Sequence, residues 1–233
     1  MGVNLDMDRR LLSALPLLLL AGCTTLEQEP VLAETAASAI MVEEDPDADW
    51  QGYANIADVD RIGLIDEAWA EGLEAVRKAG FANAVDGQGE LLDPAAGLAK
   101  PDPTPGSYEC RLVKLGQAKP SDPMYIAYNP FFCYVEVEDV EGDAEGRFTI
   151  VKQTGSQRPA GRLWDAGERY VFLGSLALGG EREPLAYGED PERDMAGVWE
   201  RIGPFRWRLV IPYPRNGGII DVFELTPVAD QPE

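Results

Sequence analysis

The second half of the chain is a succession of short β-type runs, and this pattern most constrains the fold. From residue 107 onward, stretches rich in Val, Ile, Tyr, Phe and Trp alternate with turn signals that contain Gly, Pro and Asp. We expect eight strands, at residues 107–115, 131–138, 147–153, 160–165, 169–177, 197–202, 205–212 and 221–227. Strands joined mostly by short links favour an antiparallel meander, which removes its exposed edges by closing. The predicted fold is therefore mainly β, a small antiparallel meander barrel, with a two-sheet sandwich as the alternative.

One amphipathic helix is expected before the β-domain, over residues 56–79. Its apolar residues recur three or four positions apart and form one stripe: Ile62, Ile65, Trp69, Leu73 and Val76. Asn55 or Asp58 can cap its start, and Gly80 can end it. The polar face is acidic, whereas a helix that lies on a membrane surface has a basic polar face. We therefore expect the stripe to dock on the β-domain.

The segments on either side of this helix are expected to be connections without packed secondary structure. Residues 23–54 are small, acidic and without a sustained period, which predicts a flexible tether. After the helix, a Pro- and Gly-rich connection completes the segment 55–106. The β-domain follows at residues 107–229, and no internal repeat is evident.

The N-terminal residues indicate an anchored protein. The apolar run at residues 11–21 is too short to span a membrane, because a spanning helix needs about 20 apolar residues. Arg9 and Arg10 supply the positive flank of a secretory signal. At the end of the run, "LAGC" resembles the lipobox of bacterial lipoproteins, with Cys23 as its cysteine. An ordinary signal peptide that happens to end beside a cysteine is the alternative.

The lipobox resemblance implies a site of lipidation and an address. In lipoproteins the peptide is cut before the cysteine, so residues 1–22 would be the signal peptide and Cys23 the acylated first residue. Several acyl chains hold a protein far more firmly than one chain does. Thr24 stands where an aspartate retains Gram-negative lipoproteins at the inner membrane, which implies the outer membrane, facing the periplasm. Whether translation begins at Met1 or Met7 stays open.

The other two cysteines, Cys110 and Cys133, form an even pair in an oxidising compartment. Both lie in predicted strands, and alternation points both side chains toward apolar faces. We expect a structural disulfide, which closes a loop of about two dozen residues and adds about 3 kcal/mol to the free energy of unfolding. The alternatives are a redox pair, which is more naturally C-x-x-C, and a metal site, for which the chain lacks histidine.

The formal net charge of −21, from 41 acidic and 20 basic residues, excludes some partners. Such a charge argues against nucleic acid and against anionic lipid surfaces. It favours solubility, basic protein partners or weakly held divalent ions. The plainest interpretation is that the charge keeps the protein dispersed.

The residue types argue against common enzyme chemistry. The chain has no histidine, which excludes Ser-His-Asp and Cys-His catalysis and disfavours a catalytic zinc. "TGSQR" lacks the G-x-S-x-G pattern of a nucleophile elbow, and "GSLALGG" lacks the lysine of a phosphate loop. Paired carboxylates could hydrolyse glycosides, but 41 acidic residues single out no pair. We expect a protein that is not an enzyme, with no cofactor, catalytic residue or metal.

Two stretches bring basic and aromatic residues together, "KQTGSQRPAGRLW" and "RDMAGVWERIGPFRWRLVIPYPR". The candidate ligand-binding residues in them are Lys152, Arg158, Arg162, Trp164, Arg206 and Arg208. Guanidinium groups beside aromatic rings suit an anionic or aromatic ligand. The alternative, which we favour, is that the tryptophans are core and that the arginines pair with neighbouring acids. Among the candidates, Arg158 and Arg162 are preferred because they follow "TGSQ" at the end of a strand.

The order of several motifs resembles an uncharacterised family of alphaproteobacterial lipoproteins. These motifs are the lipobox, the helix with "AW", "PGSYECRLVKLG", "TGSQRPAGRLW", "YVFLG" and "ERIGPFRWRL". The resemblance covers most of the mature chain and implies a location but no activity. Separately, a strand with "YEC" in a small barrel is similar to the membrane-bound lysozyme inhibitors, whose acidic surface faces a basic enzyme.

These observations lead to a ranked set of functions. The first is a non-enzymatic envelope lipoprotein, held to the membrane by its lipid anchor, whose β-domain binds a small molecule, a lipid or another envelope protein. The second is an inhibitor of a basic cell-wall hydrolase. The third is a hydrolase that uses paired carboxylates.

Overall fold

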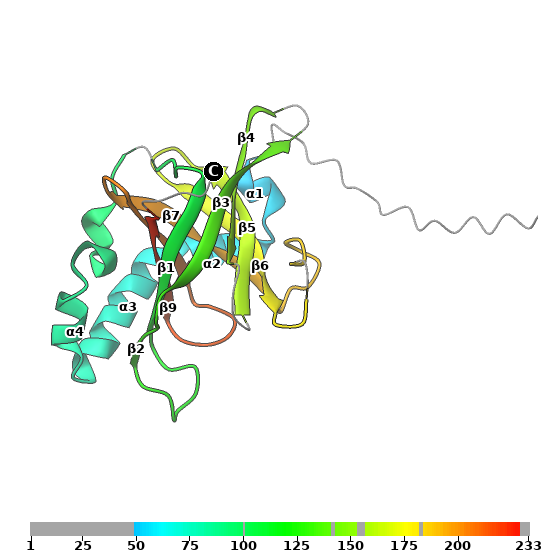
Figure 1. Cartoon of the computed structure of the whole chain (residues 1–233). Helices are drawn as coiled ribbons and strands as arrows, with labels where there is room; N and C mark the ends of the chain where they lie inside the picture. Colours follow the sequence, from blue (N-terminus) through cyan, green and yellow to red (C-terminus); the bar gives the residue numbers. More distant parts are fainter. Residues whose placement is uncertain (1–48, 100, 141–142, 153–156, 182–183, 229–233) are drawn as a thin grey trace, which may run out of the picture. The chain divides into compact units, whose positions relative to one another are not determined.

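The computed structural model describes residues 49–99, 101–140, 143–152, 157–181 and 184–228. Within them, a run of short helices is followed by antiparallel strands that close into a barrel (Figure 1). The predicted signal peptide, Cys23 and most of the predicted tether lie outside the described residues.

The described residues form nine strands. Their bounds are β1 (Gly106–Leu115), β2 (Tyr125–Ala127), β3 (Phe131–Val140), β4 (Asp143–Lys152), β5 (Gln157–Asp165), β6 (Tyr170–Leu178), β7 (Asp194–Gly203), β8 (Arg206–Pro212) and β9 (Ile220–Pro227). The helical elements are α1 (Trp50–Tyr53), α2 (Ile56–Gly63), α3 (Ile65–Lys78), α4 (Ala82–Asp86) and the 3₁₀ turns η1 (Gly89–Leu92) and η2 (Pro94–Ala96).

The barrel is closed, which confirms the predicted fold. Its strands follow the order β1-β3-β4-β5-β6-β7-β8-β9, every neighbouring pair is antiparallel, and β9 pairs back onto β1. All eight predicted strands are present. The short strand β2 was not predicted. It pairs with β1 at residues 113–115, where β3 no longer does, so one edge of β1 changes partner along its length.

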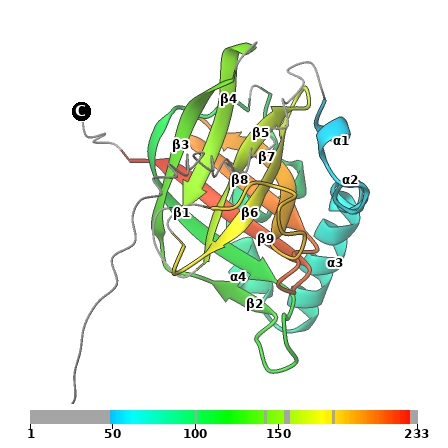
Figure 2. The ribbon, with the colours of Figure 1, turned by 90° about the vertical axis from the view of Figure 1, so that its right-hand side faces the viewer.

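Alternation along the strands separates two hydrophobic clusters, one inside the barrel and one on its outer face. The buried members of the inner cluster are Tyr108, Cys110, Cys133, Val135, Ile150, Leu163, Phe172, Trp199, Trp207, Leu209, Ile211, Phe223 and Leu225. In the outer cluster, Ile62, Ile65 and Trp69 of the helices pack on strand residues such as Val198 and Val210. Figure 2 shows α2 and α3 along one side of the barrel. The apolar stripe therefore docks on the β-domain, as predicted.

The predicted single helix over residues 56–79 is wrong in one respect, because the structure divides it into α2 and α3 at Leu64. Leu64 leaves the helical conformation (φ −96°, ψ 17°) directly after Gly63, a residue with low helix propensity. The apolar stripe continues across the break. Asn55 caps α2, since its side chain accepts a hydrogen bond from the amide of Asp58.

The segments predicted as connections contain more structure than expected. Residues 50–53, at the end of the predicted tether, form α1, and the Tyr53 ring stacks on Trp164 at 4.7 Å. The predicted Pro- and Gly-rich connection contains α4, η1 and η2. Pattern reasoning failed here because these turns are short and tertiary contacts hold them in place.

Residues 101–105 close one end of the barrel. The indole N–H groups of Trp199 and Trp207 both donate to the Pro101 carbonyl, at 2.9 and 3.0 Å. The Tyr108 hydroxyl donates to the Thr104 carbonyl at 2.5 Å. The proline-rich segment therefore satisfies the polar groups of the large aromatic residues in that half of the interior.

The predicted disulfide between Cys110 and Cys133 is present. It joins β1 to β3 inside the barrel, with a Cα–Cα distance of 5.9 Å and a sequence separation of 23. Among the described residues, no helix has the length and apolar character needed to cross a membrane.

Candidate functional site

The end of the barrel opposite residues 101–105 contains a cavity of about 420 Å³. This is the end where β2 and the loop between β8 and β9 lie (Figure 1). Its apolar wall consists of Leu112, Phe131, Pro159, Leu176, Met195 and Phe223. Its polar groups include the side chains of Lys114, Lys152, Asn216 and Asp221. An apolar cavity into which a few polar groups converge is the usual form of a small-molecule site.

The cavity exists because the inward-facing side chains change along the barrel axis. In the closed half, Tyr108, Trp199 and Trp207 fill the interior and are almost completely buried. In the other half, the same faces of β1 and β9 carry charged side chains, Lys114 and Asp221. One half of the interior is therefore packed, and the other half leaves room for a ligand.

Lys114 and Asp221 form a buried ion pair in this half. They are register partners on β1 and β9, and Lys114 Nζ lies 2.9 Å from Asp221 Oδ2 and 3.2 Å from Asn216 Oδ1. Asp221 is only 2% exposed, and its Oδ1 has no hydrogen-bond partner among the described residues. Burial raises the pKa of Asp221 to about 6, although the charge of Lys114 acts in the opposite direction. A buried acceptor without a partner is costly to the fold.

Lys152 is the second cation of the cavity. Its Nζ lies 4.0 Å from the centroid of the Phe131 ring, a cation–π contact. Burial lowers the pKa of Lys152. No carboxylate of the described residues forms an ion pair with it. With Asp221 ionised and paired with Lys114, the charged groups among the described lining residues sum to one excess positive charge.

A domain of unknown function (DUF4893) matches residues 50–225, from α1 to β9. The chain belongs to the DUF4893 family. The match includes the helices, the whole circuit of the barrel up to Leu225, and the cavity. No curated protein and no solved structure matches the chain.

The arginines predicted as ligand-binding residues on β8 have partners within the DUF4893 domain. Arg208 is fully buried on the outer face of the barrel, and its guanidinium lies 5.0 Å from the Trp69 ring centroid. It pairs with Glu200 at 2.7 Å and donates to the main-chain carbonyls of Glu90, Leu91, Asp93 and Pro94. Arg206 pairs with Glu224 at 2.7 Å and Glu90 at 3.1 Å. Arg208 therefore fixes η1 and η2 against the barrel.

The candidates on β5 also lie outside the cavity. Arg162 donates two hydrogen bonds to Glu138, at 2.7 and 2.9 Å. Arg158 donates to the main-chain carbonyls of Leu178 and Glu181. Trp164 is buried on the outer face, where the Arg147 guanidinium lies 3.9 Å from its ring centroid. The structure therefore does not bring the six candidates together, and Lys152 is the one among them that lines the cavity.

Sequence reasoning missed Lys114 and Asp221. The available signal was a charged residue on the apolar side of a predicted strand. Lys114 follows Cys110 and Leu112 in that alternation, and Asp221 precedes Phe223. A charge in such a position is rarely buried unless it is paired.

A second buried charge of the DUF4893 domain has a structural role. Asp58 of α2 accepts hydrogen bonds from Asn55 and Tyr187, both at 2.7 Å, and pairs with Arg61 and Arg215. Burial alone would raise the pKa of Asp58, but the hydrogen bonds from Tyr187 and Arg61 and the two arginine charges lower it overall. Both carboxylate oxygens are occupied, so this cluster anchors α2 to the loops that follow β6 and β8.

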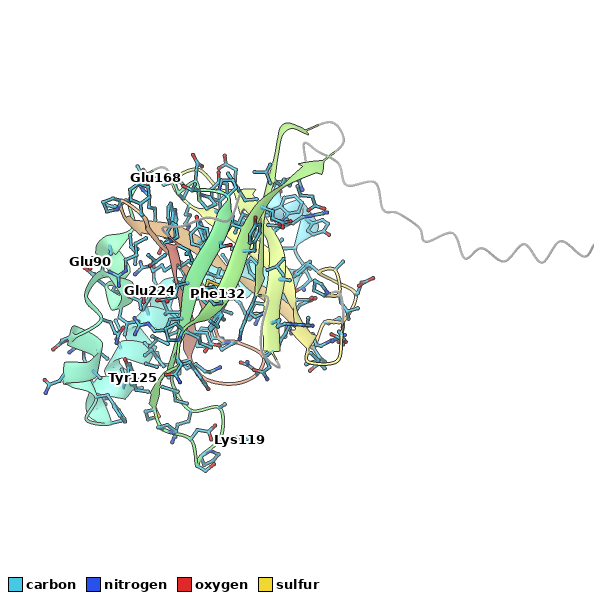
Figure 3. The ribbon with its side chains drawn as sticks, in the orientation of Figure 1. Glu90, Lys119, Tyr125, Phe132, Glu168 and Glu224 are labelled. Carbon is cyan, nitrogen blue, oxygen red and sulfur yellow. A yellow bond between two sulfur atoms is a disulfide. The ribbon has the colours of Figure 1, made fainter. Side chains whose placement is uncertain are left out.

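The described residues also form another hollow, which has fewer apolar groups than the cavity. A polar hollow of about 540 Å³ lies at the opposite end of the barrel, beside Gly97, Glu168 and Arg169. Figure 3 shows Glu168 at that end and Lys119 at the end with the cavity. No group of three or more potential metal ligands occurs among the described residues.

Proposed function

We propose that the DUF4893 domain of this chain binds a small molecule in the 420 Å³ cavity. The observation that carries the proposal is the half-filled barrel interior. There, within the part of the chain that the structure describes, apolar walls meet a lysine without an ion pair, Lys152, and an oxygen without a hydrogen-bond partner, Asp221 Oδ1. A closed barrel of eight strands has an interior that can hold one small ligand. The proposal is binding rather than catalysis, because the described residues that line the cavity include no Ser, Thr, Cys or His side chain.

The sequence supports a location for this binding. The lipobox resemblance favours an envelope lipoprotein with residues 1–22 removed and Cys23 acylated. Thr24 favours the outer membrane, with the domain facing the periplasm. The net charge of −21 favours partners other than nucleic acid.

Native mass spectrometry of the full processed chain tests the binding. We expect a bound mass on the protein as purified from the envelope. Met195→Trp places a larger side chain into the cavity and should remove the bound mass. Phe205→Trp is the matched control, because Phe205 is 69% exposed and lies between β7 and β8, away from the cavity. The same occupancy in wild type and both variants would contradict binding in the cavity.

A second function, inhibition of a basic cell-wall hydrolase, is supported by the net charge of −21. Such an inhibitor should bind lysozyme-like enzymes at physiological ionic strength, where the Debye length is about 8 Å. Binding that disappears between low and physiological salt would indicate only non-specific attraction.

A further inference from the structure

The unequal pairing of the two cavity lysines indicates what kind of ligand the cavity takes. Lys114 already has an anionic partner, Asp221, at 2.9 Å and an amide partner, Asn216, at 3.2 Å. Lys152 lies over the face of the Phe131 ring and has no ion pair with a carboxylate of the described residues. A partly buried cation without a counter-ion is unfavourable, and an anion at this position would remove that cost.

Most of the remaining wall is apolar, although Tyr128, Asn129 and Gln157 also line the cavity. Leu112, Met195 and Phe223 face the cavity from β1, β7 and β9, and Phe131 and Leu176 add further apolar surface. Burial of an aliphatic body against such a wall contributes about 0.8 kcal/mol for each methylene group. The wall therefore favours a ligand whose remaining atoms are mostly hydrocarbon.

We infer that the cavity binds an aliphatic carboxylate, with its carboxylate beside Lys152 and its hydrocarbon body along Leu112, Met195 and Phe223. This inference rests on the proposed function and specifies its ligand class. One excess positive charge matches one negative charge. A lysine presents a compact point charge to a carboxylate, whereas forked recognition of a phosphate is more often made by arginine. Asp221, paired with Lys114, disfavours a second anionic group in the same cavity.

Photoaffinity labelling of the full chain in its membrane tests the ligand class. The probes are dodecanoate and dodecanol, each with a diazirine on the same carbon of the chain. Peptide mapping reads the labelling of peptides that contain Leu112, Met195 or Phe223. We expect half-maximal labelling by the carboxylate at a concentration at least about tenfold lower than by the alcohol.

Lysine variants test whether the charge of Lys152 causes the preference for the carboxylate probe. Lys152→Gln should raise the half-maximal concentration of the carboxylate probe about tenfold or more and leave that of the alcohol unchanged. Lys152→Arg keeps the positive charge and should retain most of the difference in half-maximal concentration between the carboxylate and the alcohol probe. Lys119→Gln is the matched control, since Lys119 lies at the same end of the barrel but in the exposed loop before β2 (Figure 3). Alkylation of the unreduced variants checks that the Cys110–Cys133 disulfide is intact, and unchanged labelling by the alcohol probe checks that the cavity is.

Three results would overturn the inference. If both probes label the cavity peptides equally and Lys152→Gln changes neither, the cavity binds small molecules but does not select a carboxylate. If unlabelled dodecyl phosphate competes at a lower concentration than unlabelled dodecanoate, the ligand class is a phosphate. If neither probe labels the cavity peptides in any variant, the proposed function fails together with the inference.

Discussion

Asp221 combines nearly complete burial with an ion pair that uses only one of its two oxygens. Its pKa in the folded protein, about 6, lies above the ordinary value of 3.8. The folded protein therefore binds this proton more tightly than the unfolded chain does. The contribution of Asp221 to the free energy of unfolding is greatest below about pH 4 and is lost as the pH rises through 6, by up to about 3 kcal/mol.

Asp221→Asn removes this titration and provides the reference. Urea unfolding of wild type and variant between pH 4 and pH 7 should show that the stability of the wild type, relative to the variant, declines over this interval. If the difference in free energy of unfolding between wild type and Asp221→Asn stays constant with pH, the carboxyl group of Asp221 titrates alike in the folded and the unfolded chain.

Arg208 provides a second prediction for a single residue. Arg208→Met should lower the free energy of unfolding by about 3–5 kcal/mol, because it leaves Glu200 and several buried or part-buried carbonyls without their donor. Arg206→Met in the same strand is the control. Arg206 is part exposed, and the loss should be no more than about 1 kcal/mol. Equal losses in urea unfolding would contradict the role of Arg208 in fixing η1 and η2.

Only some residues of the candidate site could be predicted from the sequence. Lys152 is the one candidate from the sequence that lines the cavity. The favoured alternative for the others agrees with the structure at Trp207, which is core, and at Arg208, which pairs with Glu200. The pair between Lys114 and Asp221 depends on the register of β1 with β9, which are more than 100 positions apart in the chain. No local periodicity encodes such a register.

The disulfide is an element-scale feature, because it fastens β3 to β1 close to the position where β1 changes partner to β2. Replacing both Cys110 and Cys133 with Ala should lower the free energy of unfolding by about 3 kcal/mol, since the bond restricts the unfolded chain. Urea unfolding of the oxidised wild type and the double variant measures this loss.

A control for this prediction is the wild type after full reduction, which should resemble the double Ala variant. Free thiols at both positions in the denatured, unreduced protein would contradict the disulfide itself. Ligand labelling in the cavity should survive the double replacement, because neither sulfur lines the cavity.

Among the elements, strands were more predictable than helices and connections. The eight predicted strands alternate strongly, and the observed bounds follow that alternation. The break at Leu64 and the strand β2 were missed because each involves three residues or fewer. The closure by residues 101–105 depends on the Pro101 carbonyl meeting Trp199 and Trp207, which lie about 100 positions later in the chain.

At the scale of the whole molecule, the net charge of the chain and the charge of the cavity have opposite signs. The chain carries a net charge of −21, yet the cavity carries one excess positive charge in its interior. Net charge alone would predict repulsion of every anion. A carboxylate is attracted only where it is close to Lys152 and shielded from the rest of the surface, so the acidic exterior slows the approach of such a ligand without preventing its binding inside the barrel.

Acylation of Cys23 would decide where the whole chain is held, and it can be tested directly. If Cys23 is acylated, a palmitate analogue should label the wild type and not Cys23→Ser, whose leader should also stay uncleaved. Thr24→Asp tests acylation and membrane localisation separately. The lipobox resemblance predicts that this variant is still labelled but fractionates with the inner rather than the outer membrane. Labelling of Cys23→Ser, or its recovery in cleaved form with the outer membrane, would contradict the anchor. Something other than acylation of Cys23 would then hold the cavity-bearing domain at the membrane.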